Sequence, residues 1–264
     1  MRERLVHVPF RGSIRERSVE PYVRLLRSLR GRRRIKGVLF DISSGGGEVV
    51  ASTDLYLAVK RLDATVPVFA SIGAVGASGA YLAALGARRI FAYPQSQVGS
   101  IGVVYPHVAV RELVRRLGIS VDLLHVGEHK DAFSGYRPLT EVERAKVLAT
   151  VQEDYDGFVR AVADARHRPL EAIRALATGE VWSGAKALEL GLVDALGDRE
   201  AALEELARTV HVASRRTVRL TPPRPLLERM FTSGAGAVSA SLSDRLGDAF
   251  EDLLLGGDGP GLRR

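Results

Sequence analysis

Ser78 lies in a run of small residues where a serine could act as a nucleophile. Residues 73–80 read Gly-Ala-Val-Gly-Ala-Ser-Gly-Ala and follow an apolar stretch, 66–72, that is typical of a buried strand. A helix is expected to begin near the serine, and the free N–H groups of its first turn would stabilise a developing oxyanion. The same position also suits a serine that only caps the helix.

A glycine-rich loop follows another apolar stretch, 35–42, and reads Ser-Ser-Gly-Gly-Gly-Glu over residues 43–48. Its glycines permit unusual backbone angles and expose N–H groups. A phosphate-binding P-loop requires a Lys-Ser/Thr pair after the loop, whereas Glu48-Val49 stands there. The loop is therefore better interpreted as an oxyanion-binding loop, with a simple tight turn as the alternative.

A serine hydroxyl needs a base to take its proton, and Lys130 is a candidate. Only five of the 38 Lys and Arg residues are lysines, and Lys130 lies in a loop, 127–138, rich in helix and strand breakers. At an unperturbed pKa of ~10.4, about one lysine in 10³ is neutral at pH 7, so a carboxylate partner would defeat this role. We therefore expect Asp131 to point away from Lys130. The alternative is a solvated loop lysine.

Two histidines offer another base. His107 follows Ser78 by 29 residues and His129 precedes Lys130, so a Ser–His–Asp triad stays open as a weaker hypothesis. The spacing of His, Asp and Glu suggests no metal site.

Strand-like and helical patterns alternate along the chain, which favours an α/β fold with a mainly parallel sheet. The expected strands are 5–9, 35–42, 66–72, 89–92, 121–126 and 216–220. The expected helices are 19–29, 49–62, 78–85, 108–117, 140–166, 170–177 and 199–207. Thr140 and Glu143 form a capping box at the start of the longest helix.

Composition and charge argue against several other classes of protein. The 264 residues include no cysteine, which excludes a disulfide framework and a thiolate zinc site. The net charge of +7 comes from arginine, including a cluster at 32–34, but no aromatic residues are interleaved there, so nucleic acid is not favoured as a partner. The sequence shows no signal peptide and no apolar run of about 18 residues.

The chain divides into an expected catalytic domain, 1–210, and a C-terminal extension, 211–264. From residue 221 the composition shifts toward Pro, Gly, Ser and Ala. A stripe of apolar residues in this extension lies on one face of an expected helix and could contact, in order of preference, a neighbouring subunit, the domain itself or a membrane surface: Leu242, Leu246, Phe250, Leu253 and Leu254.

Five segments, in this order, resemble the signal peptide peptidase A family of serine proteases. They are the glycine loop at 43–47, the serine segment at 76–81, Gly-Ser-Ile-Gly-Val at 99–103, His-Lys-Asp at 129–131, and Ala-Leu-Glu-Leu-Gly-Leu-Val-Asp at 187–194. The resemblance covers roughly residues 5–210 and implies a Clp protease/crotonase-like fold of repeated ββα units.

The resemblance also implies a catalytic Ser–Lys dyad. Ser78 would be the nucleophile and Lys130 the general base, with Ser100 orienting the lysine. The N–H groups of Gly46, supported by Gly45 in the same loop, and of Ser78 itself would form the oxyanion hole. No cofactor or metal is implied.

The family implies cleavage of hydrophobic peptides, such as signal-peptide remnants, by a ring-like homo-oligomer. Ser44 replaces the usual proline of the glycine loop, and we find no counterpart of the family's membrane anchor. We therefore expect a cytoplasmic protein and leave peripheral membrane contact open. Two rival functions are a crotonase-like acyl-CoA enzyme, which would need neither Ser78 nor Lys130, and a non-catalytic peptide-binding scaffold.

Overall fold

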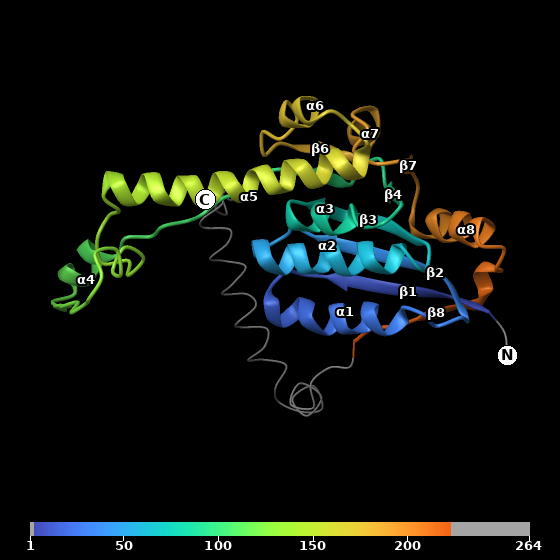
Figure 1. The fold of residues 1–264 in the computed structure, drawn as a ribbon, viewed down its shortest axis with the longest axis horizontal. Coiled ribbons are helices and arrows are strands. Elements are labelled where there is room, and N and C mark those ends of the chain that lie inside the picture. Colours follow the sequence, from blue (N-terminus) through green and yellow to red (C-terminus); the bar gives the residue numbers. More distant parts are fainter. Residues whose placement is uncertain (1–2, 223–264) are drawn as a thin grey trace, which may run out of the picture. The chain divides into compact units, whose positions relative to one another are not determined.

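A mainly parallel sheet forms the centre of the protein in a computed structural model that describes residues 3–222 (Figure 1). Its strands run in the order β6-β5-β3-β2-β1-β8, and β4 pairs with β3 and β7. Every pairing is parallel except that of β5 with β6. The expected α/β arrangement is therefore confirmed.

The strands are β1 (Arg4–Arg11), β2 (Ile35–Ser44), β3 (Val68–Ala77), β4 (Arg89–Ala92), β5 (Gln97–Gly99), β6 (Val181–Ser183), β7 (Ala195–Leu196) and β8 (Thr217–Arg219). The helices are α1 (Glu16–Leu29), α2 (Val49–Asp63), α3 (Gly79–Ala84), α4 (Arg111–Arg116), α5 (Glu141–Arg166), α6 (Leu170–Arg174), α7 (Gly184–Glu189) and α8 (Arg199–Thr209). The capping box expected at the start of α5 is confirmed, because Thr140 and Glu143 exchange hydrogen bonds.

Apolar side chains cover both faces of the central strands, as a parallel sheet requires. Because successive side chains point to opposite faces, Val38 and Phe40 belong to a large core with α1, α2 and α3, while Leu39 joins a smaller core with α8. Parallel pairing of β1, β2 and β3 brings their carboxyl ends to one edge of the sheet. The glycine loop and the serine turn both start from this edge.

Helix α5 extends beyond the sheet, and α4 lies at its outer end (Figure 1). We call residues 104–150 the arm. Only Ala132 and Glu143 are buried within it. The strand expected at 121–126 does not form, because no strand among the described residues pairs with this segment and its apolar side chains stay exposed.

The sheet extends past the domain boundary expected at residue 210. Val212 is buried in the smaller core and β8 pairs with β1, so the compact unit continues to Thr221. The apolar stripe of the C-terminal extension lies outside the described residues. Within residues 3–222, no helix combines the length and the apolar character needed to cross a membrane.

A hydrogen bond from Tyr81 links α3 to the segment that leads into β7. Its side chain is fully buried, and its hydroxyl donates to the Leu192 carbonyl at 2.8 Å. We predict that Tyr81→Phe lowers the free energy of unfolding by about 1 kcal/mol, since the buried carbonyl loses its donor. Urea unfolding measures this change. Tyr93→Phe is the matched control, because Tyr93 is 40% exposed, and an equal loss in both variants would contradict the assignment.

Candidate active site

Ser78 occupies a strained position between β3 and α3. Its backbone angles are φ 50° and ψ −126°, a region that residues other than glycine rarely adopt. Although Ser78 is the N-cap residue of α3, its side chain makes no capping hydrogen bond. The alternative of a serine that only caps the helix is therefore not supported, and the hydroxyl stays available for chemistry.

The glycine loop packs directly against the serine turn. A Cβ added to Gly46 would lie 2.7 Å from the Gly79 nitrogen and 2.9 Å from the Ser78 Cβ, and Gly46 has φ 101°. Only glycine fits this contact without displacing backbone. The glycine loop after β2 and the serine turn after β3 are therefore in direct contact beside the Ser78 side chain.

The two donors expected for an oxyanion hole are both engaged. The Ser78 N–H donates to the Gly99 carbonyl at 2.8 Å, so it cannot serve as the second donor. The N–H of Gly79 takes this place in our interpretation, because it opens α3 and has no partner within the helix. The Gly46 N–H donates to the buried Ser44 hydroxyl at 3.1 Å, which a substrate oxygen would replace.

A cavity of about 660 Å³ opens beside Ser78. Ser100 also lines it and has φ 50°, with its N–H bound to the Glu180 carbonyl at 2.7 Å. Small and apolar groups form much of the remaining wall, including Val49, Leu82, Gly102, Val103 and Phe158. The charged residues that line it are Glu153 and Asp154 of α5, both acidic.

Lys130 does not line this cavity and is exposed in the arm. Its neighbour His129 contacts Glu143 and Lys146 in the first turns of α5, whereas Phe158, further along the helix, lines the cavity. With a rise of ~1.5 Å per residue, Glu143 and Phe158 are about 20 Å apart along the helix axis. The structure brings Ser78, Gly46 and Ser100 together and places Lys130 elsewhere in the same protomer.

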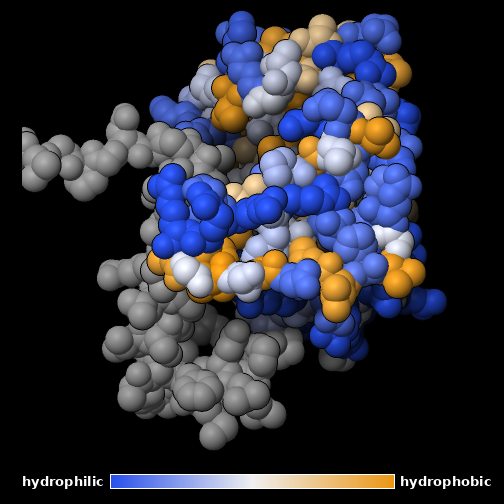
Figure 2. Space-filling view, turned by 90° about the vertical axis from the view of Figure 1, so that its left-hand side faces the viewer, coloured by the Kyte–Doolittle hydropathy of each residue, from blue (hydrophilic) through white to orange (hydrophobic). Residues whose placement is uncertain are grey.

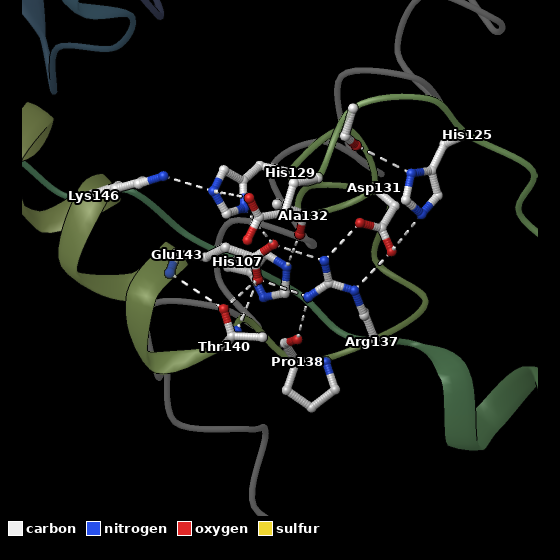
Figure 3. A network of polar contacts seen from close by, with 12 residues as sticks. His107, His125, His129, Asp131, Ala132, Arg137, Pro138, Thr140, Glu143 and Lys146 are labelled. Carbon is white, nitrogen blue, oxygen red and sulfur yellow. Dashed lines mark hydrogen bonds and ion pairs between the residues drawn. The ribbon is translucent and has the colours of Figure 1, made fainter.

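The carboxylate of Asp131 is bound by Arg137 (Figure 3). Two guanidinium nitrogens lie 2.6 and 2.7 Å from its two oxygens, and these bonds lower the pKa of the Asp131 carboxyl. No ion pair joins Asp131 to Lys130 among the described residues. Asp131 is therefore paired with Arg137, which agrees with the expectation that it does not pair with Lys130.

The histidines do not form a triad with Ser78. His107 bonds to the Ala132 carbonyl, and His129 lies 2.6 Å from Lys146 and 3.4 Å from Glu143, all within the arm. Neither histidine lines the Ser78 cavity. Among residues 3–222, no cluster of three His, Asp or Glu side chains could hold a metal ion.

Sequence reasoning missed two groups in and around this site. It did not single out Gly79, although a residue that follows a serine and opens a helix must carry a free N–H. It also passed over Arg137, and the sequence offered only weak signals for this arginine, namely acidic residues six positions away on either side.

Comparisons with known proteins identify relatives. Residues 60–213 match the family model for peptidase family S49. A Methanocaldococcus jannaschii protein, whose protease assignment is itself provisional, is 37% identical over 73% of this chain and 62% of its own length. A Synechocystis protein with an equally provisional protease assignment is 30% identical over 93% of this chain and 88% of its own length.

The chloroplastic serine protease SPPA of Arabidopsis thaliana is 31% identical over 70% of this chain, which spans only 27% of that relative. Two solved structures share the fold. A ClpP1 mutant from Listeria monocytogenes has a TM-score of 0.51 at 17% identity, covering 73% of this chain and 91% of its own. A mutant of the 1510-N membrane-bound stomatin-specific protease has a TM-score of 0.54 at 12% identity, covering 84% and 100%. The Clp protease-like fold is confirmed.

The contact between the glycine loop and the serine turn can be tested by adding one methyl group. We predict that Gly46→Ala destabilises the protein by about 1–3 kcal/mol and removes labelling of Ser78 by a fluorophosphonate, because the methyl group meets the serine turn at a positive φ. Thermal unfolding and labelling measure the two effects.

Gly45→Ala is the matched control in the same loop. A Cβ there meets nothing within 4 Å, so the stability should stay near that of the unaltered protein. Equal behaviour of the two variants would show that the close approach is unimportant.

Proposed function

The chain belongs to peptidase family S49, and we propose that it is a serine endopeptidase in which Ser78 is the nucleophile and Lys130 the general base. The observation that carries this proposal is the Ser78 turn, strained and uncapped, packed against Gly46 and open to a cavity. The Ser–Lys assignment follows the resemblance noted in the sequence, and Ser100 at the cavity wall suits a residue that orients the lysine.

The proposed reaction has two steps. The Ser78 hydroxyl oxygen attacks the peptide carbonyl carbon while neutral Lys130 takes its proton, and the carbonyl oxygen becomes an oxyanion facing the N–H groups of Gly46 and Gly79. The C–N bond then breaks, and the lysine returns the proton to the leaving amine. A water molecule, deprotonated by the same lysine, hydrolyses the acyl-enzyme and regenerates Ser78.

A second copy of the chain is proposed to supply Lys130. The arm that carries this lysine leaves large apolar side chains in solvent: Val104 is 85% exposed, Leu124 91% and Val126 98%. Figure 2, which views the molecule from the arm side, shows hydrophobic residues at the surface between hydrophilic ones. Burial of these residues against a neighbouring copy would stabilise a homo-oligomer and bring each lysine to the next Ser78 cavity.

The cavity suits extended peptides with small or apolar side chains, such as signal-peptide remnants. Its apolar wall, with Leu82 and Phe158, offers burial to such side chains. A cleavage profile from a peptide library tests this preference. Selection of charged residues on the acyl side of the cleaved bond would contradict it.

Peptide hydrolysis by the unaltered protein, Ser78→Ala and Lys130→Ala tests the dyad itself. We predict that each substitution lowers kcat by at least about 10³-fold, because nucleophile and base act as a unit. Circular dichroism checks folding. An unaltered protein that cleaves no peptide would instead favour the acyl-CoA or scaffold function, and near-normal activity of Lys130→Ala would return His107 and His129 to consideration.

Mixed assemblies of the two inactive variants test whether the dyad forms between copies. Ser78→Ala and Lys130→Ala chains carrying different tags are co-expressed and purified through both tags. If each site joins two copies, random mixing regenerates roughly a quarter of the sites, because one interface in four pairs an intact serine with an intact lysine. A dyad within one copy regenerates none, so an inactive mixture, or a monomer by light scattering, would refute assembly between copies.

A further inference from the structure

Arg137 is the centre of the polar network in the arm (Figure 3). Besides the two bonds to Asp131, its guanidinium donates to both oxygens of Glu143 at 2.7 Å and to the Pro138 carbonyl at 3.1 Å. One side chain thus satisfies two carboxylates, and Arg137 is only 26% exposed. Planar bidentate binding of this kind is specific to arginine.

Glu143 is more buried than the other two charged residues that Arg137 joins into this network, Asp131 and Arg137 itself. It belongs to the first turn of α5, is 4% exposed, and also accepts hydrogen bonds from the Thr140 N–H and hydroxyl. Its bonds with Arg137 hold the pKa of the Glu143 carboxyl well below its usual range. Arg137 bridges Glu143 and Asp131. The loop at 127–138, which carries Lys130 and has no regular structure of its own, is therefore held against the start of α5.

Asp131 directly follows Lys130, so it is the carboxylate that the lysine would meet first. Other charged or titratable groups also face this loop. His125 lies 3.7 Å from Asp131, Glu128 is exposed beside His129, and Lys146 approaches His129 from α5. Arg137 already occupies both oxygens of Asp131 in this arrangement.

We propose that Arg137 is a positioning residue for catalysis: it holds the Asp131 carboxylate away from Lys130 and fixes the loop that presents this lysine. The proposal rests on the function proposed above, because it assumes that Lys130 must be neutral to act as a base. Without Arg137, the freed carboxylate pairs with the ammonium form of Lys130 and the base is lost at neutral pH.

Activity as a function of pH distinguishes this role from a merely structural one. In Arg137→Gln, we expect kcat at pH 7 to fall about tenfold and the rise of kcat with pH to move up by about one pH unit, since a paired lysine becomes neutral only at higher pH. In Asp131→Asn/Arg137→Gln the rise should return to its original pH, because no carboxylate is left to pair with Lys130. Arg144→Gln is the matched control, because the ion pair that the Arg144 side chain makes within residues 3–222 is an exposed contact of 4.0 Å with Glu141 on the same helix. This variant should behave as the unaltered protein.

A second measurement does not depend on peptidase activity. The chain has only five lysines, so the Lys130 signal can be assigned in protein labelled with ¹³C-lysine by comparison with Lys130→Arg. Its titration midpoint should move up in Arg137→Gln and return in the double variant. If the unaltered protein cleaves no peptide, the proposed function fails while this titration still tests the role of Arg137.

Folding is checked by circular dichroism for every variant. If Arg137→Gln does not fold, Arg137→Lys replaces it, because one ammonium cannot hold two carboxylates with the same four bonds, and a smaller shift in the same direction is expected. A loss of kcat without any shift of the pH profile or the lysine titration would overturn the proposal. So would a double variant that keeps the shifted profile of Arg137→Gln.

Discussion

The candidate site depends on one close approach, that of the Gly46 backbone to the Ser78 turn. Parallel pairing of β2 and β3 brings the ends of these strands to the same edge, but the loops after them can meet only because Gly46 lacks a Cβ. The contact places a glycine loop beside the serine hydroxyl and the first N–H of α3. Strain at Ser78 is tolerated because a buried helix and a buried strand hold the turn from both sides.

The remaining wall of the site comes from parts of the chain that are distant in sequence. Gly99 accepts the Ser78 N–H, and Glu180 accepts the Ser100 N–H, so β5 and the segment before β6 fix the two serines in one cavity. Helix α5 then closes the cavity with Tyr155 and Phe158. A single sheet edge therefore combines contributions from both halves of the chain, which explains why the signals in the sequence are spread over more than a hundred residues.

The sequence predicted the fold well where a residue pattern has one physical interpretation. The mainly apolar run at 35–42 favoured a strand covered on both faces, which β2 is, and the Thr140–Glu143 capping box marks the start of α5. The segment 121–126 shows the limit: its apolar residues read as a strand, yet no strand within residues 3–222 pairs with them. The hydrogen bond from the Ser78 N–H to the Gly99 carbonyl could not be predicted from the sequence either, because it depends on the position of Gly99 in space.

Because Ser78 and Lys130 are far apart in one chain, the proposed function requires two things of the arm: it must position Lys130 and it must contact a second copy. In the role proposed for it, the arm holds Lys130 in a defined place, and the Arg137 bonds to Asp131 and Glu143 serve that purpose within one copy. In the proposed assembly, a second copy would also bury the apolar side chains that the arm exposes. If Ser78 and Lys130 meet only on assembly, an isolated chain carries the serine turn without its base and cleaves nothing. Under the proposed function, proteolysis would then begin only where copies have assembled, because Ser78 and Lys130 lie on parts of the fold that do not meet within one chain.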